Sequence, residues 1–165
     1  MRETQTIPGR DIVDELPHLR RFAYSLIRDV ADADDLVQAT LERALDRGMP
    51  SDADLRPWLF RVCRNLWIDD MRKDRTRDKA KPVLTVVASN EPSAETAAAD
   101  RMLLDQVQTA VASLPNKYRE VMSLVAVGGA SYREASETLG LPVGTIMSRL
   151  ARARAMIADV VSYND

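Results

Sequence analysis

The stretch Tyr132-Arg-Glu-Ala-Ser-Glu-Thr-Leu-Gly-Leu-Pro-Val-Gly-Thr-Ile-Met-Ser-Arg-Leu-Ala-Arg-Ala-Arg154 decides the fold of its half of the chain. Its spacing predicts two helices joined by a short turn, at which Gly140 accepts the positive φ that such a turn needs. Small side chains at Ala135 and Ser136 let the second helix cross the first closely. The inward-facing residues that set the crossing angle are Leu139, Leu141, Ile146 and Leu150. The pattern is that of a helix-turn-helix.

The outward face of the second helix carries groups that bond bases or phosphates. Its predicted contacts are Thr145, Ser148, Arg149 and Arg152. A recognition helix lies in a major groove in this way, with side chains on base edges and arginines on the backbone. Similar turns also occur in structural helical hairpins, but Gly144 to Ile157 holds three arginines and no acid. This basic face favours DNA reading.

Apolar residues at spacings of three and four predict helices along most of the remaining chain. We expect helices at 11–28, 32–47, 54–75, 94–113, 115–127, 131–139 and 142–160. Residues 76–94 lack this helical periodicity of apolar residues, and their composition is that of a linker. The sequence therefore predicts an all-α protein of two small helical domains joined by a flexible linker.

Details of the first three helices are also predicted. Asp32 is expected to cap the second helix, and Pro17 to mark a break or a start in the first. Trp58 lies on the apolar stripe of the third helix and is expected in the core, whereas Trp67 fits either the core or base stacking. The expected buried stripe of the second helix is Leu36, Val37, Thr40, Leu41, Ala44 and Leu45.

Charge is segregated along a chain whose net charge is only −2. Residues 29–46 hold six acids (Asp29, Asp32, Asp34, Asp35, Glu42 and Asp46) and the base Arg43. Residues 61–81 hold eight bases (Arg61, Arg64, Arg72, Lys73, Arg75, Arg77, Lys79 and Lys81) and four acids. Such patches suggest two kinds of partner, although solvated helix faces also produce them.

The composition argues against several classes of protein. With one cysteine (Cys63) and one histidine (His18), the chain forms no internal disulfide or cysteine-based zinc cage and offers no nucleophile–histidine constellation. Cys63 is interpreted as a small buried hydrophobe. No run reaches the length of a membrane span, and residues 1–10 lack a secretory segment. We expect a cytoplasmic, non-enzymatic protein without cofactor, metal or small-molecule substrate.

The second half resembles region 4 of extracytoplasmic-function (ECF) sigma factors in three motifs. They are Leu114-Pro115-x-x-Tyr118-Arg119-Glu120-Val121, Ser131-Tyr132-x-Glu134-Ala135 and Gly144-Thr145-Ile146-x-Ser148-Arg149-Leu150-x-Arg152-Ala153-Arg154.

The first half resembles regions 2.2 to 2.4 of the same family. Region 2.2 is matched by Asp32-Ala-Asp-Asp35-Leu36-Val37-Gln38-Ala39-Thr40. Regions 2.3 and 2.4 are matched by Pro57-Trp58-Leu59-Phe60-Arg61-Val62-x-Arg64-Asn65-x-x-x-Asp69-x-x-Arg72. Motifs in both halves, in the right order, make the resemblance specific.

The resemblance implies a role for particular residues. The region 2.2 residues Asp34, Asp35, Gln38 and Glu42 would bind the β′ clamp helices of RNA polymerase, and region 4 would meet its β flap. Asn65 would capture a base of the −10 element, with Arg61, Arg64, Arg72 and Lys73 on phosphates. The −35 element would be read by Thr145, Ser148, Arg149, Arg152 and Arg154. Met147 stands where many relatives carry Lys or Arg, so the resemblance implies that a phosphate or base contact is missing here or replaced by an apolar one.

The implied domains are region 2 at 1–76, a linker at 77–94 and region 4 at 95–165. An anti-sigma factor that covers these surfaces is a further implied partner. A sigma-like mimic that binds an anti-sigma factor remains an alternative, although such a role would tolerate loss of the arginines retained here. A stand-alone helix-turn-helix repressor is another, but it leaves the region 2.2 motif and Asn65 unexplained.

Overall fold

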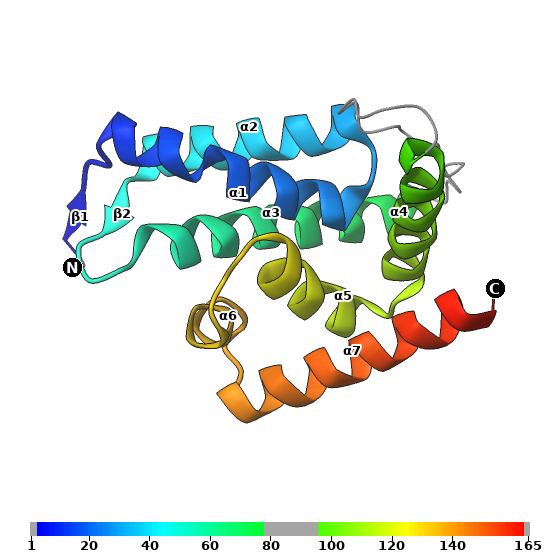
Figure 1. Ribbon diagram of the computed structural model, residues 1–165. Helices are drawn as coiled ribbons and strands as arrows, with labels where there is room; N and C mark the ends of the chain where they lie inside the picture. Colours follow the sequence, from blue (N-terminus) through cyan, green and yellow to red (C-terminus); the bar gives the residue numbers. More distant parts are fainter. Residues whose placement is uncertain (1–2, 78–95, 164–165) are drawn as a thin grey trace.

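The computed structural model describes residues 3–77 and 96–163, which are mostly helical (Figure 1). The elements in chain order are β1 (Thr4–Gln5), α1 (Gly9–Ile27), α2 (Val30–Arg47), β2 (Met49–Pro50), α3 (Leu55–Arg77), α4 (Thr96–Ser113), α5 (Asn116–Met122), the π-helical turn η1 (Ser123–Val127), α6 (Tyr132–Leu139) and α7 (Val143–Tyr163). The predicted all-α class with two helical units is confirmed. The predicted linker at 77–94 lies, beyond Arg77, outside the described residues.

The N-terminal helical unit (residues 3–77) is an up-and-down arrangement of α1, α2 and α3 (Figure 1). Its core forms where the apolar stripes of the three helices meet. The rings of Phe22 in α1 and Phe60 in α3 lie with their centroids 4.9 Å apart. Burial of such aromatic side chains dominates the packing energy of a small core.

The junction between α1 and α2 corrects two predictions. Arg28 adopts the left-handed conformation (φ 65°), and α2 then begins at Val30. The cap is therefore Asp29, whose Oδ1 accepts a hydrogen bond from the Asp32 backbone N–H at 2.9 Å; the prediction of Asp32 as the cap is wrong. Pro17 marks neither a break nor a start, because α1 runs from Gly9 to Ile27 with the proline on an exposed position.

Leu45 does not belong to the buried stripe of α2. It is 63% exposed, whereas its neighbour Ala44 is fully buried. Successive helical residues point about 100° apart, so a stripe centred on Leu36, Val37 and Ala44 leaves Leu45 outside. The prediction that Leu45 is buried is wrong, and its side chain lies on the outer surface of α2.

A two-stranded antiparallel sheet closes one end of the N-terminal unit. Thr4 pairs with Pro50 and Gln5 with Met49. Behind it lies a smaller apolar cluster, made of Ile7, Ile12, Ala44, Met49 and Leu59. Strands of two residues carry no readable periodicity, so the sequence did not predict them.

The structure places the two tryptophans in different surroundings. Trp67 is 4% exposed and belongs to the main core, so it does not stack freely on bases. Trp58 is only partly buried against the smaller cluster, and the prediction of a core position holds in part. Cys63 is fully buried, as its interpretation as a small hydrophobe requires.

The C-terminal helical unit (residues 96–163) contains α4 to α7. The predicted helix at 115–127 is divided into α5 and η1, and Pro115 precedes α5 as its N-cap residue. The predicted ends of the last helix, 142 and 160, lie within a few residues of the observed Val143 and Tyr163. The order of elements is thus close to the predicted one.

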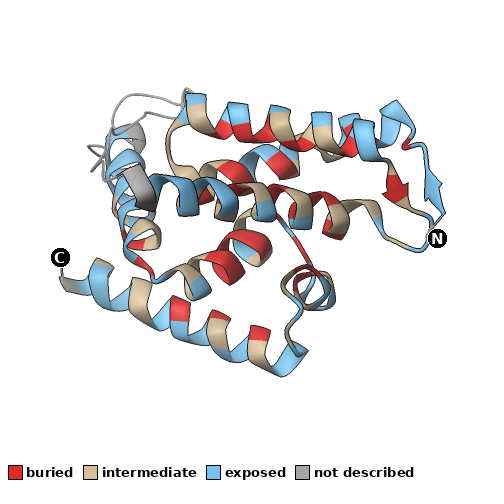
Figure 2. Ribbon diagram, turned by 180° about the vertical axis from the view of Figure 1, so that it is seen from behind, coloured by how far each residue is buried: buried red, intermediate tan, exposed pale blue. Residues whose placement is uncertain are grey.

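The two helical units share one core. Contacts join α1 to η1 and to α4, and join α3 to α6. Phe22 and Phe60 belong to the same buried cluster as Leu124, Ile146 and Leu150 of the C-terminal unit. Figure 2 shows the buried residues on the helix sides that face the middle of the molecule. The relative placement of the units therefore depends on burial of apolar surface.

Candidate nucleic-acid and polymerase interfaces

The helix-turn-helix is fixed by local hydrogen bonds. Ser131 caps α6: its hydroxyl accepts from the Glu134 N–H at 3.0 Å, and the Glu134 carboxylate accepts from the Ser131 N–H at 3.0 Å. This reciprocal capping box satisfies two donors that a helix start leaves open. Gly140 ends α6 with φ 65°, which confirms the predicted positive φ.

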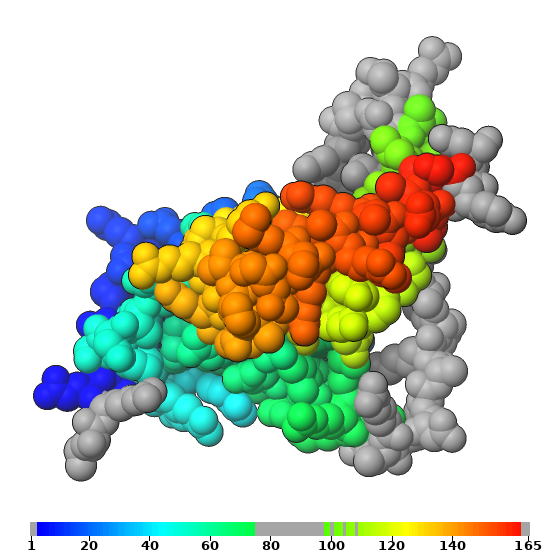
Figure 3. Space-filling model, turned by 90° about the horizontal axis from the view of Figure 1, so that it is seen from below, coloured from blue at the N-terminus to red at the C-terminus, as the bar shows by residue number. Residues whose placement is uncertain are grey.

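The turn presents α7 to solvent. Ile146, Leu150 and Ala153 are buried and hold α7 on the rest of the C-terminal unit. The opposite side of α7 is free, and Figure 3 shows the helix running across one face of the molecule. A helix anchored along one stripe and open along the other can enter a groove of DNA.

Four of the five predicted −35 residues lie on one stripe of α7. Ser148 and Arg152 are exposed, and Thr145 and Arg149 are partly buried beside them. The Ser148 hydroxyl donates to the Thr145 carbonyl at 3.1 Å. The stripe holds two guanidinium groups and two hydroxyls and no carboxylate, which suits an anionic partner.

Arg154 does not share this stripe. It follows Arg152 by two residues, which places it about 200° further around the helix. It is exposed, and so is Met147, at 52% on the same side. The structure thus separates Arg154 from the other predicted −35 residues.

The predicted polymerase-binding residues form one exposed face of α2. Asp34, Asp35, Gln38 and Glu42 are all exposed. The Gln38 amide donates to the Glu42 carboxylate at 3.4 Å, as neighbours one helical turn apart can. We call these four residues the acidic face of α2.

The sequence reasoning missed Leu45 in this surface. Leu45 follows Gln38 by seven residues and Glu42 by three, so it extends the same face. It is an isolated apolar side chain with most of its surface open to solvent. The exposure of Leu45 could have been predicted from helix geometry. Ala44 lies on the buried stripe, and the next residue of a helix points about 100° away from it.

The predicted −10 residues all lie on α3. Asn65 and Arg72 follow Arg61 by four and eleven residues, which aligns the three within about 40° around the helix. Arg61, Asn65, Arg72 and Lys73 are exposed. Arg64 is partly buried, and Lys73 lies roughly a third of a turn away from Arg61.

Two of these cations are engaged by the C-terminal unit. A guanidinium nitrogen of Arg61 donates to the main-chain carbonyl of Glu137, at the end of α6. The Arg64 Nε lies 3.2 Å from a carboxylate oxygen of Glu120 in α5. Both contacts join residues that are far apart in the sequence.

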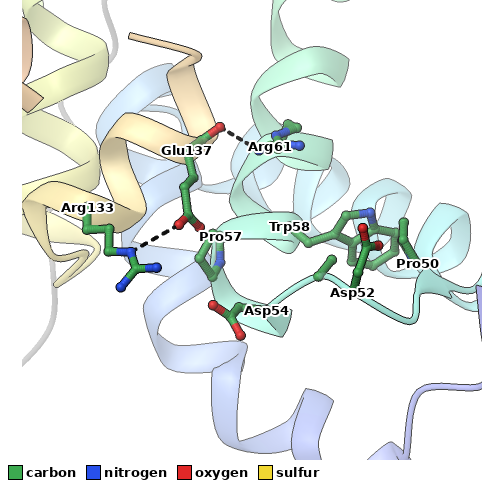
Figure 4. A pocket seen from close by; sticks show the side chains of 9 residues that line it. Pro50, Asp52, Asp54, Pro57, Trp58, Arg61, Arg133 and Glu137 are labelled. Carbon is green, nitrogen blue, oxygen red and sulfur yellow. Dashed lines mark hydrogen bonds and ion pairs between the residues drawn. The ribbon is translucent and has the colours of Figure 1, made fainter. Parts of the chain in front are cut away.

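A cleft lies beside the Arg61 contact, between the start of α3 and α6. Its volume is about 360 Å³. Figure 4 shows Arg61 reaching from α3 toward Glu137, whose carboxylate pairs with Arg133 at 3.4 Å. Asp52, Asp54 and Trp58 line the other side. The wall is mixed in charge and selects no single class of small ligand.

Two other kinds of site are absent from the part of the chain that the structure describes. There, no three histidine, cysteine, aspartate or glutamate residues gather in a way that could hold a metal ion. None of the helices described is both long and apolar enough to cross a bilayer.

Two family models match the chain, one in each helical unit. The model "Sigma-70, region 4" matches residues 104–157, which include the helix-turn-helix. The model "Sigma2 domain of PhyR" matches residues 12–64. The two matches divide the chain as the motifs do.

Known proteins resemble the chain over most of its length. The ECF RNA polymerase sigma factor EcfG of Rhodopseudomonas palustris is 38% identical over 92% of this chain and 83% of its own. The sigma factor RpoE of Bartonella quintana, solved in complex with the anti-sigma factor NepR, superposes with a TM-score of 0.76, 28% identity, and coverage of 94% of this chain and 97% of its own. CnrH, solved with the cytosolic domain of CnrY, gives a TM-score of 0.68, 29% identity, and coverage of 95% and 88%.

The fold, the basic recognition helix and these likenesses define a sigma factor of the sigma-70 type. The chain belongs to the family of ECF RNA polymerase sigma factors. Members of this family are transcription initiation factors and not enzymes.

Proposed function

We propose that this protein binds the core RNA polymerase and directs it to promoters. The observation that carries the proposal is the stripe of Thr145, Ser148, Arg149 and Arg152, which lies open on a helix anchored along its other side. Hydroxyls and arginines on such a stripe contact base edges and phosphates of a −35 element. Arg154, on the other side of α7, contributes at most a phosphate contact.

The acidic face of α2 is the proposed docking site for the β′ clamp helices of the polymerase. Asp34, Asp35, Gln38 and Glu42 present carboxylates and an amide in a row, which complements a basic helix and accelerates encounter. Leu45 adds an apolar contact at the end of the row. The proposed partner of the C-terminal unit on the polymerase is the β flap.

On α3, the proposed −10 contacts are Arg61, Arg64, Asn65, Arg72 and Lys73. A flipped base needs polar groups for its edge, and the separated strand needs positive charge. Asn65 supplies the first, and the four cations supply the second. The proposed functional domains are residues 1–76 and 95–165, joined by the linker at 77–94.

Control by an anti-sigma factor in the cytoplasm is part of the proposal. RpoE, which superposes on the chain over nearly its full length, was solved with the anti-sigma factor NepR, and CnrH was solved with the cytosolic domain of CnrY. We expect a partner of this kind to bind across both helical units and to compete with polymerase and DNA.

The direct test is run-off transcription from a pool of genomic fragments, with the cognate core polymerase and with or without this protein. New start sites that share spaced −10 and −35 elements would support the proposal. A folded protein that binds the core polymerase but yields no start site would contradict the promoter-directing role.

A second candidate function is that of a sigma-like mimic, which captures an anti-sigma factor and binds no promoter. The match of residues 12–64 to the sigma2 domain of PhyR favours it. Retention of Arg149 and Arg152 on the open stripe speaks against it. Failure to form a complex with the cognate core polymerase, together with capture of the anti-sigma factor, would select the mimic.

A further inference from the structure

The C-terminal unit occupies part of the surface that is proposed to read the −10 element. Arg61 and Arg64 are both held by acceptors of this unit, namely the Glu137 carbonyl and the Glu120 carboxylate. We call this placement of the two units the closed arrangement. The inference below rests on the proposed function of Arg64 as a phosphate contact.

The Arg64–Glu120 pair is the polar centre of the contact. The Nε–Oε1 distance is 3.2 Å, and the side chains of Arg64 and Glu120 are only 23% and 11% exposed. The hydrogen bond of the pair is donated by Nη2 to the other carboxylate oxygen at 3.5 Å, whereas the Nε–H has no hydrogen-bond partner and meets Oε1 as an ion pair only. A guanidinium meets a DNA phosphate through the same nitrogens, so it cannot bind both acceptors fully at once.

Contacts on either side support the closed arrangement. The Thr138 hydroxyl in α6 donates to the Glu134 carbonyl of its own helix at 2.8 Å and lies 3.2 Å from the Pro57 carbonyl at the start of α3, so its proton is shared between the two acceptors. Gly128, after η1, packs against the Phe60 ring, and a Cβ placed at this glycine would lie 3.1 Å from two ring carbons and 3.0 Å from the Leu124 carbonyl oxygen. The absence of a side chain at residue 128 therefore lets the two units approach.

The closed arrangement is too short to read both promoter elements. By their names, the −10 and −35 elements are centred roughly 25 base pairs apart, which is roughly 85 Å of B-DNA. A compact chain of this length has a radius of gyration of about 15 Å and a diameter of about 40 Å. The two units have to separate before both elements are bound.

We propose that Glu120 is an intramolecular competitor of DNA, whose carboxylate occupies Arg64 in the closed arrangement and releases it when the units separate. The free protein is then a weak DNA binder because its open form is the minor one. Removing the carboxylate shifts the equilibrium toward the open form. The pair thus couples domain separation to exposure of a −10 contact.

Trp67 provides a built-in reporter of the opening. It is buried, and it lines a small pocket of about 190 Å³ together with Asn116 and Glu120 of α5. When α5 moves away, water and quenchers reach this indole. In a Trp58→Phe background, Trp67 is the single tryptophan of the chain.

The first measurement is acrylamide quenching of Trp67 in Glu120→Gln. The matched control is Asp105→Asn, which removes a carboxylate from an exposed position of α4. We expect faster quenching and red-shifted emission in Glu120→Gln and no change in the control. Gly128→Ala opens the same contact sterically, with Gly9→Ala, where an added Cβ meets nothing within 4 Å, as its control.

The second measurement is binding of the free protein to a fluorescein-labelled single-stranded oligonucleotide of mixed sequence. If the open form is a minor species, Glu120→Gln should bind about tenfold more tightly than the wild type. The gain should disappear when Arg64→Ala is added, and Asp105→Asn should show no comparable gain.

The outcomes separate this inference from the proposed function. Unchanged quenching in Glu120→Gln would overturn the competitor role, whatever Gly128→Ala does, and would leave the promoter function intact. Exposed Trp67 without tighter oligonucleotide binding would overturn the competition and count against Arg64 as a DNA contact. If Glu120→Gln loses its helical circular dichroism, Arg64→Ala breaks the same pair from the other side, and wild-type quenching of Trp67 in Arg64→Ala would overturn the competitor role.

Discussion

The Ser136 hydroxyl donates a hydrogen bond to the Leu141 carbonyl across the turn between α6 and α7, and the Leu141 N–H returns one to the Ser136 carbonyl at 3.2 Å. The two bonds close the turn from both sides. They fix the direction in which α7 leaves the turn, and hence the stripe that faces outward.

The turn depends on the conformation of Gly140. Its φ is 65°, and a Cβ added to it would meet no atom within 4 Å, so Gly140→Ala introduces backbone strain without a steric clash. We expect a loss of about 1–2 kcal/mol in the free energy of unfolding. Urea denaturation would measure it, with Gly144→Ala as the control, because no positive φ and no close atom occur there. Equal stability of the two variants would contradict the account.

Arg149 and Arg152 are expected to contribute more to promoter binding than Arg154. Replacement of either by alanine should weaken holoenzyme binding to its promoter by ~1–3 kcal/mol if the side chain contacts a base edge. Arg154→Ala is the matched control, because it removes the same charge from the other side of α7. Footprinting titrations would give the affinities. A larger loss for Arg154 than for the pair would place the recognition surface on the wrong side of the helix.

Charge reversal on the acidic face should impair polymerase binding. The double variant Asp34→Lys/Asp35→Lys places like charges against a basic partner and should reduce the affinity for the core polymerase, mainly through slower association. Asp11→Lys reverses a charge in the first turn of α1 and serves as the control for helix-end effects. Surface-immobilised core polymerase would report both rates, and wild-type affinity in the double variant would remove the face from the interface.

Leu45 should behave as a binding residue rather than a core residue. Because it is 63% exposed, Leu45→Ala should leave the melting temperature nearly unchanged. We expect the affinity for the core polymerase to fall by about 1 kcal/mol or more if the leucine fills a pocket there. Val13→Ala, at a position 61% exposed on α1, is the matched control. A large drop in melting temperature for Leu45→Ala would argue for burial instead.

Burial raises the pKa of the Cys63 thiol to about 12, against a smaller opposing effect of its hydrogen bond with Thr40. In the unfolded chain the thiol has its ordinary pKa of 9.0 and loses its proton first. The unfolded state therefore binds fewer protons between these two values, and the thiol's contribution to stability falls as the pH rises through that window. The stabilising contribution of the protonated Cys63 thiol is fully present below pH 9.0.

We expect Cys63→Ala to show a smaller decrease of unfolding free energy between pH 9.0 and about 11 than the wild type. Denaturant titrations at a series of pH values would test it, and the difference between the two proteins removes the shared titration of lysines and tyrosines. Parallel pH curves would contradict the shift.

Local features of this protein were readable from the sequence. The seven predicted helices correspond to observed ones within a few residues, and the positive φ of Gly140 was correctly predicted. These features depend on residues three or four apart and on turn chemistry, which the chain carries in its own order. The acidic face of α2 and the stripe on α7 follow from the same periodicity.

The misplaced residues share a different cause. Leu45 and Trp58 lie at edges of apolar stripes, where a sequence pattern does not say which side a neighbouring helix covers. Asp29 replaced Asp32 as the cap because the backbone of Arg28 turns the chain earlier. The position of these residues was decided by the packing of a neighbouring helix or, for the cap, by the backbone conformation of Arg28.

The sequence by itself determined the class of the protein, its helices and the composition of its two candidate faces. Only the tertiary structure decided that Arg64 meets Glu120, 56 residues away, and that Phe60 packs on Gly128. Such pairings depend on how two apolar surfaces fit when they are buried together, and packing of this kind leaves no periodic trace in either segment.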